Sequence, residues 1–111
     1  MSSDLPTTTE RIRAIGSSIE PDVIALRRRF HRHPELSGKE RWTSDALCAE
    51  LDALGIPYRR VAGTGVIATI AGEAAASATA SESGARSCVA LRADIDALPV
   101  TEQTRAPYAS E

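Results

Sequence analysis

The stretch "ALRADIDALPV", from Ala90 to Val100, is a strand-like run that ends in two aspartates and a proline. Residues i and i+2 of a strand face the same side, with Cα atoms about 7 Å apart at a rise of ~3.3 Å per residue. Asp94 and Asp96 therefore share one face, and two carboxylates this close repel each other. We expect a positive group beside them: a metal ion, a substrate cation or an arginine.

The aspartate pair has two interpretations that the pattern alone leaves open. In the first, Arg92 and Asp94 form a structural ion pair, and Asp96 caps a turn or helix that follows. In the second, the pair lies at the carboxyl end of a strand, where ligands gather in open α/β sheets. Carboxylates at such a place suit a divalent cation, either directly or through hydrogen bonds to its ligands.

The composition excludes several classes of partner. Hydrophobic residues make up 42% of the 111 positions and charged residues 25%, which is ordinary for a soluble globular protein. The net charge of −2 provides no basic field for nucleic acid or an anionic membrane. No apolar run reaches the ~18 residues of a membrane span, and the first ten residues do not read as a secretory signal. We therefore predict a cytoplasmic protein without nucleic-acid or membrane partners.

The two cysteines, Cys48 and Cys88, lie in apolar patterns without zinc-finger or CxxC spacing. We interpret both as buried thiols in a reducing compartment.

Helix signals dominate the first half of the chain. Residues 1–20 are polar and are expected to be partly disordered or helical, with a short helix over residues 11–17. A firmer helix is predicted to begin at Pro21, which suits the first helical position, and to end before Pro34. "SGKE", residues 37–40, is typical of a capping box, so a further helix is predicted from there to Leu54, with Gly55 as its stop.

After Gly55 the apolar period changes to that of strands. We predict a hairpin of strands 56–61 and 66–71 around the turn "GTG" at residues 63–65. Residues 73–86, rich in Ala and Ser, are interpreted as a flexible loop, with a marginal helix as the alternative. A third strand, residues 87–93, then leads to the aspartate pair.

"FHRHPELS" offers His31, His33 and Glu35 as further candidates. Two residues apart on a helix, the histidines point about 200° apart and cannot chelate one ion together. We favour helix-end histidines that bond local carbonyls. Glu35 is expected to bond an arginine such as Arg28 or Arg32.

Taken together, "LRRRFHRHPELSGKE", "LDALGI", "GTGVIATIAG" and "VALRADIDALPVTEQTRAPYAS" resemble the start of the N-acyl-amino-acid amidohydrolases. This is the hippurate hydrolase and auxin-conjugate hydrolase branch of the aminoacylase-like metallopeptidases. The resemblance implies that residues 21–111 are the N-terminal portion of an α/β/α metallopeptidase-type catalytic domain, an incomplete α/β fold of two helices, a hairpin and a third strand. It further implies an enzyme that cleaves N-acyl amino acids and forms a homodimer.

The resemblance also implies a site with two divalent metals, zinc or manganese, and a metal-activated water. The family's principal ligands and its glutamate base follow the Pro-Tyr-Ala-Ser segment and are absent from this chain, so no metal ligand is assigned here. Asp96 corresponds to an aspartate that orients the site. Asp94 stands where related branches have a metal-ligating histidine. The fragment alone is expected to be inactive; a non-enzymatic, self-standing α/β binding module is the alternative.

Overall fold

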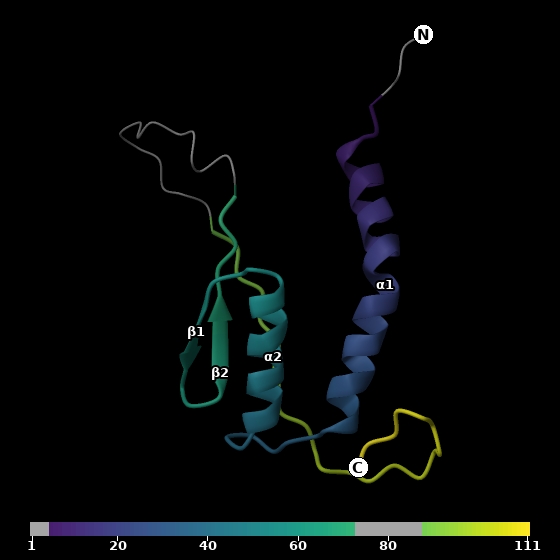
Figure 1. Cartoon of the computed structure of the whole chain (residues 1–111), viewed down its shortest axis with the longest axis vertical. Coiled ribbons are helices and arrows are strands. Elements are labelled where there is room, and N and C mark those ends of the chain that lie inside the picture. Colours follow the sequence, from purple (N-terminus) through teal and green to yellow (C-terminus); the bar gives the residue numbers. More distant parts are fainter. Residues whose placement is uncertain (1–4, 73–87) are drawn as a thin grey trace. The chain divides into compact units, whose positions relative to one another are not determined.

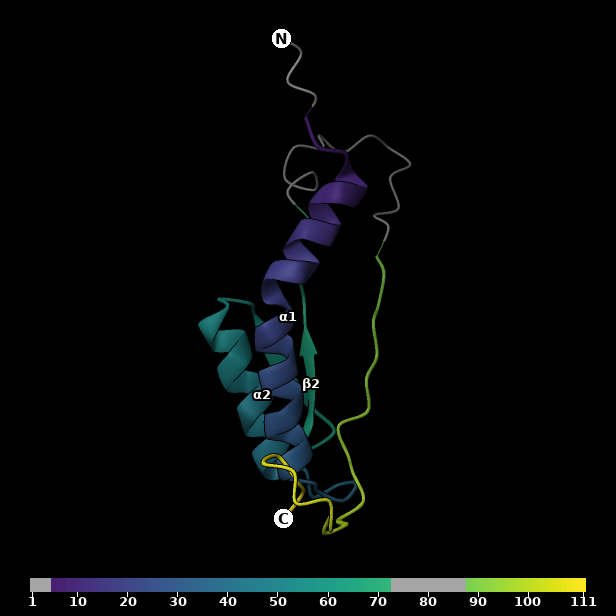
Figure 2. The same ribbon diagram turned by 90° about the vertical axis from the view of Figure 1, so that its right-hand side faces the viewer.

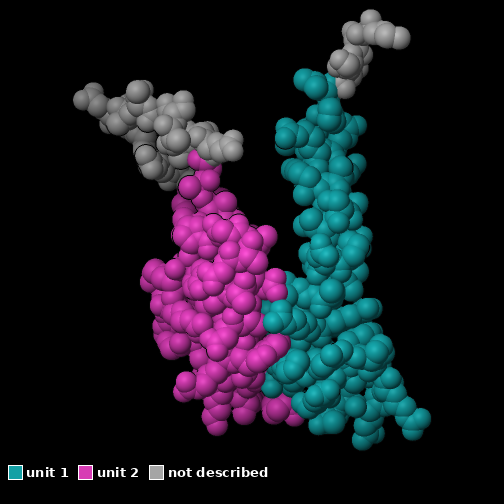
Figure 3. All heavy atoms as spheres, in the orientation of Figure 1, with its two compact units in different colours: residues 1–34, 100–111 teal, residues 35–99 magenta. Residues whose placement is uncertain are grey.

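The computed structural model describes residues 5–72 and 88–111, and the chain divides into two units (Figures 1 and 3). One unit comprises Met1–Pro34 together with Val100–Glu111, and the other comprises Glu35–Pro99. The first unit contains helix α1, and the second contains helix α2 and strands β1 and β2. The chain is therefore an α/β fragment with two helices and a two-stranded antiparallel sheet within the described residues.

Helix α1 spans Thr8–Arg32 and begins with a capping box. The Thr7 hydroxyl accepts a hydrogen bond from the Glu10 N–H (3.3 Å), and the Glu10 carboxylate accepts one from the Thr7 N–H (2.8 Å). The predicted separate start at Pro21 is wrong, because Pro21 lies inside this one helix. Proline costs a helix interior about 3 kcal/mol, yet here the helical turns on both sides continue across it.

The end of α1 agrees with the prediction from Pro34. The helix stops at Arg32, and the N–H of its C-terminal cap, His33, donates to the carbonyl of Phe30 (3.0 Å). Basic side chains in the last turn (Arg29, His31 and Arg32) suit the negative end of the helix dipole. Neither α1 nor the other described helix is long and apolar enough to cross a membrane.

Helix α2 spans Arg41–Ala53, and its predicted capping box is wrong. Glu40 is the N-cap, but neither it nor Ser37 makes a side-chain cap bond. The predicted end is confirmed: Gly55 has φ +65° and its N–H donates to the Asp52 carbonyl (3.0 Å). The buried face of α2 consists of small or polar residues (Thr43, Ser44, Ala46 and Cys48).

The predicted hairpin is confirmed with shorter strands. Strand β1, Tyr58–Val61, pairs antiparallel with β2, Gly65–Ala68. Ala62 and Gly63 have positive φ in the connecting turn, as such tight turns require. A Cβ on Gly65 would lie 2.9 Å from the Val61 carbonyl oxygen, so this position accepts only glycine without displacement.

The predicted third strand is wrong in this structure. Residues 88–100 form no regular secondary structure, because a strand requires a hydrogen-bonded neighbour and none is described beside them. Cys48 is buried as predicted. The predicted burial of Cys88 is wrong, because no neighbouring strand covers it within the described residues and its thiol is exposed. The predicted loop at residues 73–86 lies outside the described residues.

Within the described residues the hydrophobic core is small. Its buried apolar members are Ala46 and Cys48, both on α2. Large apolar side chains remain exposed on α1 and along residues 88–100, including Ile12, Ile15, Leu91 and Leu98. Hydrogen bonds therefore carry much of the local order in the second unit.

Candidate functional site

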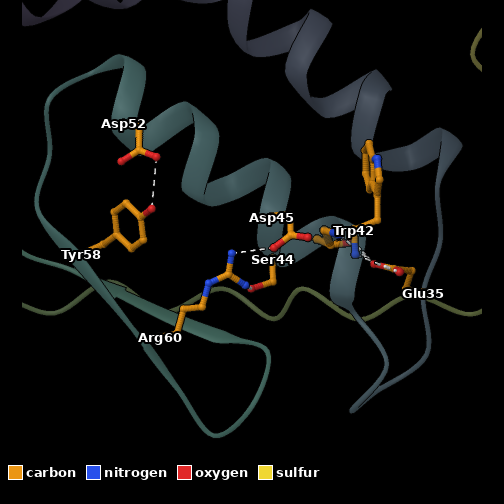
Figure 4. Close-up of polar contacts among 8 residues, drawn as sticks. Glu35, Trp42, Ser44, Asp45, Asp52, Tyr58 and Arg60 are labelled. Carbon is orange, nitrogen blue, oxygen red and sulfur yellow. Dashed lines mark hydrogen bonds and ion pairs between the residues drawn. The ribbon is translucent and has the colours of Figure 1, made fainter.

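Glu35 connects two of the sequence motifs within the second unit. Its carboxylate accepts hydrogen bonds from the backbone N–H groups of Trp42 (3.2 Å) and Thr43 (2.8 Å) and from the Thr43 hydroxyl (2.8 Å) (Figure 4). Its backbone carbonyl accepts from the Ala97 N–H (2.8 Å). Glu35 thus supplies the cap that α2 lacks at Glu40, and it fixes the chain one residue beyond Asp96.

The expected bond between Glu35 and an arginine is therefore not what the structure shows. The first N–H groups of a helix have no partner within the helix, and a carboxylate satisfies them well because the helix dipole is positive there. Burial raises the pKa of Glu35, but the hydrogen bonds from Thr43 and Trp42 outweigh that effect and lower the pKa below its ordinary value. Glu35 is a carboxylate that stabilises the fold in its ionised form.

Glu40 ties α2 to the hairpin turn. The residue is buried, and its Oε2 accepts a hydrogen bond from the Thr64 hydroxyl (2.7 Å). That bond is the main reason why the pKa of Glu40 lies below its ordinary value. Thr64 lies between the paired ends of β1 and β2, so Glu40 holds the turn against the start of α2.

The polar face of α2 also bonds β1. Arg60 donates through Nη1 to the Ser44 hydroxyl (2.9 Å) and through Nη2 to Asp45 (2.6 Å), and Tyr58 donates to Asp52 (3.2 Å) (Figure 4). Ser44 is fully buried, which makes the Arg60 bond its necessary partner. These contacts join α2 and the hairpin into one scaffold beside the segment that carries the aspartates.

The aspartate pair itself is exposed. Asp94 accepts a hydrogen bond from the Arg92 guanidinium (3.0 Å), with 72% of the Asp94 side chain open to solvent. Asp96 is exposed too. The Arg92–Asp94 ion pair is the contact that the structural interpretation expects, and an ion pair this exposed contributes little to stability. Whether either aspartate acts in catalysis stays a prediction.

The two histidines behave differently within the first unit. His33 Nδ1 lies 3.0 Å from the carbonyl oxygen of Arg29, the local helix-end bond that the sequence favours. His31 Nε2 instead lies 2.7 Å from the Glu102 carboxylate, 71 residues along the chain. The hydrogen bond with His31 is the main cause that lowers the pKa of Glu102 below its ordinary value. No local signal pairs these two residues.

The segment after Val100 folds around the end of α1. Arg28 lies over the Tyr108 ring, 4.4 Å from its centroid, and Arg32 donates to the Pro107 carbonyl (2.6 Å). The Ser110 hydroxyl donates to the Val100 carbonyl and closes the segment into a loop. Sequence reasoning missed these residues, because each contact joins positions that are distant along the chain or lack any motif.

A divalent metal is not held by the described part of this chain. Its histidine, cysteine, aspartate and glutamate residues form no group of three that could ligate an ion. Asp94 and Asp96 are two carboxylates, whereas an open catalytic metal site needs about three protein ligands. The residues present here therefore do not by themselves fit the metal centre that the resemblance implies.

Comparison with known proteins shows that the chain is similar to amidohydrolases. The chain is 40% identical over 111 residues to the N-acetyl-L-cysteine deacetylase of Bacillus subtilis, an alignment that covers 98% of this chain and 24% of that protein. It is 34% identical over 105 residues to the N-acyl-L-amino acid amidohydrolase of Geobacillus stearothermophilus, covering 94% of this chain and 26% of that protein. The predicted resemblance to amidohydrolases is confirmed.

The match with amidohydrolases is nearly complete for this chain but partial for its relatives. The chain spans about a fifth to a quarter of the length of the curated relatives it matches. The chain is thus a fragment in comparison with these amidohydrolases. No family model matches it, and no solved structure matches it.

Proposed function

We propose that this chain is one part of a longer, metal-dependent amidohydrolase that cleaves the amide bond of N-acyl amino acids or similar amides. The observation that carries this proposal is the alignment of nearly the whole chain with two proteins named for deacylation of amino-acid derivatives. The substrate we propose is a small molecule. We place the enzyme in the cytoplasm as a homodimer, without nucleic-acid or membrane partners.

Divalent metal ions, two zinc or manganese ions per site, would be held by ligands outside these 111 residues. When bound, such ions supply an activated water and polarise the amide carbonyl. The residues of this chain orient the site: Glu35 fixes the backbone at Ala97, so Asp96 stands next to an anchored position. Asp96 is proposed as a positioning residue that bonds a ligand, with Asp94 beside it.

The charge on Asp94 is shared with Arg92 through their ion pair. This pairing relieves part of the repulsion between two neighbouring carboxylates and leaves Asp96 the freer of the two. In a site with bound cations, Asp96 would thus be the carboxylate that accepts a hydrogen bond from a ligand.

The test uses the longer protein, which we define as the product of the complete reading frame that contains these residues. Purified longer protein should hydrolyse hippurate and N-acetyl amino acids, lose that activity with a chelator, and regain it with zinc or manganese. The 111-residue chain alone should show no turnover under the same conditions. Metal-dependent turnover by the 111-residue chain would refute its dependence on outside ligands. An inactive longer protein that folds cooperatively would favour the binding-module alternative.

A further inference from the structure

A pocket lies in the first unit, where the segment after Val100 folds around the C-terminal end of α1. Figures 1 and 2 show this yellow segment beside the last turns of the helix. The pocket has a volume of about 310 Å³. Its polar lining comes from two stretches that are distant along the chain: Arg28, Arg29, Arg32 and His33 on one side, and Pro107 and Tyr108 on the other.

The lining of this pocket carries positive charge. Arginine supplies three of the described lining residues and histidine a fourth, and none of them is an aspartate or a glutamate. Arg28 and Arg32 lie one helical turn apart, a spacing at which like charges repel each other. Within the described residues, neither of these two arginines forms an ion pair. An anion between them would relieve the repulsion.

Arg28 and Arg32 are also held in place with donors to spare. Arg28 lies over the Tyr108 ring, 4.4 Å from its centroid, in a cation–π contact that needs no hydrogen-bond acceptor. Arg32 uses Nη2 to donate to the Pro107 carbonyl (2.6 Å). Because a guanidinium has five N–H donors, both side chains keep N–H groups for a ligand. Their fixed positions reduce the entropy that a ligand's binding would cost.

The helix dipole acts against an anion at this place, and the charge balance decides the outcome. The C-terminal end of a helix carries about half a negative elementary charge. Arg28 and Arg32 alone contribute two full positive charges, so the pocket stays positive. The Glu102 carboxylate of the same unit is bonded by His31 (2.7 Å) rather than by an arginine. A phosphate group, with a charge of about −1.5 to −2 at pH 7, gains more here than a carboxylate with one.

We propose that this pocket binds the phosphate group of a small molecule, either free phosphate or a phosphate monoester. Arg28 and Arg32 donate to the phosphate oxygens, since the planar fork of a guanidinium matches two oxygens of one phosphate. Ala25, Pro107 and the Tyr108 ring provide the less polar part of the lining. Ligand pockets begin at about 300 Å³, so the volume suits a small ligand. The net charge of −2 provides no extended basic field for a nucleic acid.

Titration calorimetry of the longer protein with inorganic phosphate tests the site. The wild type is compared with the double variant Arg28→Gln/Arg32→Gln and with Arg27→Gln, which removes an exposed arginine of the same helix that does not line the pocket. The double variant should bind phosphate at least about tenfold more weakly, and Arg27→Gln within about twofold of the wild type. Phosphate held by metal ions would be common to all three proteins, so the difference between them reports the pocket.

Three results of this titration overturn the proposal. The first is a wild type that does not bind millimolar phosphate. The second is a double variant that binds phosphate as tightly as the wild type. The third is an equal weakening by Arg27→Gln, which would show a general effect of charge rather than a site.

A second measurement needs only the wild type, because the double substitution also removes the contacts with Pro107 and Tyr108. Phenylglyoxal modifies accessible guanidinium groups, and mass spectrometry gives the rate at each arginine. Phosphate at about five times its Kd should slow the modification of Arg28 and Arg32 about sixfold, by mass action, and leave the rate at Arg27 unchanged. Equal slowing at all three arginines, or no slowing at Arg28 and Arg32, overturns the proposal.

The choice of anion identifies the ligand class. Inorganic phosphate, glycerol 3-phosphate and acetate are compared on the wild type and the double variant. Tighter binding of glycerol 3-phosphate than of phosphate assigns the pocket to a phosphate monoester, and equal or weaker binding assigns it to free phosphate. Acetate that binds the pocket as tightly as phosphate overturns the proposal. None of these readouts depends on amide hydrolysis, so the site and the proposed reaction are tested separately.

Discussion

The carboxylates of the second unit fall into two groups. Glu35 and Glu40 accept hydrogen bonds from neighbouring backbone or hydroxyl groups, and those bonds lower their pKa values. Asp94 and Asp96 are exposed, and among the described residues Asp94 accepts a hydrogen bond from the solvent-exposed guanidinium of Arg92. A carboxylate whose oxygens already accept hydrogen bonds within the fold contributes to its stability. The difference teaches that the glutamates of "HPELSGKE" build the scaffold, while the aspartates remain exposed to solvent.

The substitution with the largest expected effect is Asp96→Asn in the longer protein. If Asp96 orients a metal ligand, removal of its charge should lower metal affinity or amide hydrolysis about 10- to 100-fold at an unchanged melting temperature. Metal content, hydrolysis and thermal unfolding are measured on the same preparation, with Asp94→Asn as the neighbouring control. Full activity with a lowered melting temperature would move Asp96 into the group of structural carboxylates.

Glu35→Ala tests the structural role of the hydrogen-bonded glutamates. The substitution leaves the N–H groups of Trp42 and Thr43 without their acceptor and should lower the free energy of unfolding by about 1–2 kcal/mol. Glu35→Gln, which keeps an acceptor oxygen, should cost less. Urea unfolding at pH 7 gives the values. A variant that unfolds like the wild type but loses hydrolysis would show that Glu35 belongs with the functional carboxylates.

The smallest effect is expected from Thr64→Val, which removes the hydroxyl that donates to Glu40. A lost hydrogen bond of this kind costs about 0.5–1.5 kcal/mol at pH 7. Because the folded-state pKa of Glu40 is lowered, its stabilising contribution is present above the ordinary pKa and is lost as the pH falls through the lowered value. Wild type should therefore lose more stability between pH 6 and pH 3 than Thr64→Val does. Equal losses would show that the Thr64 bond does not set the pKa of Glu40.

Local signals predicted the parts of the fold that depend on a few consecutive residues. Pro34 marked the end of α1, Gly55 marked the end of α2, and the glycines at 63 and 65 marked the hairpin turn. The same kind of signal failed at Pro21 and at "SGKE", because a proline or a serine–glutamate spacing is compatible with more than one helix boundary.

The candidate site was predictable only in its residue types. The sequence identified Asp94 and Asp96 by their alternation on a strand, and the combined motifs identified the amidohydrolase resemblance. It could not show that Glu35 caps α2, since the choice between an arginine and a helix N-terminus depends on where the chain turns after Pro34.

The sequence by itself thus determined the C-terminal ends of the two helices, the hairpin and the family resemblance, because each depends on a short-range pattern or on sequence motifs. Only the tertiary structure decided the pairing of His31 with Glu102, the bond from Thr64 to Glu40, and the exposure of Cys88. The tertiary structure also showed that residues 88–93 do not form a strand. The physical reason is the same in each case: a side chain or a strand edge takes its role from a partner, and that partner is brought near by the fold rather than by the sequence interval.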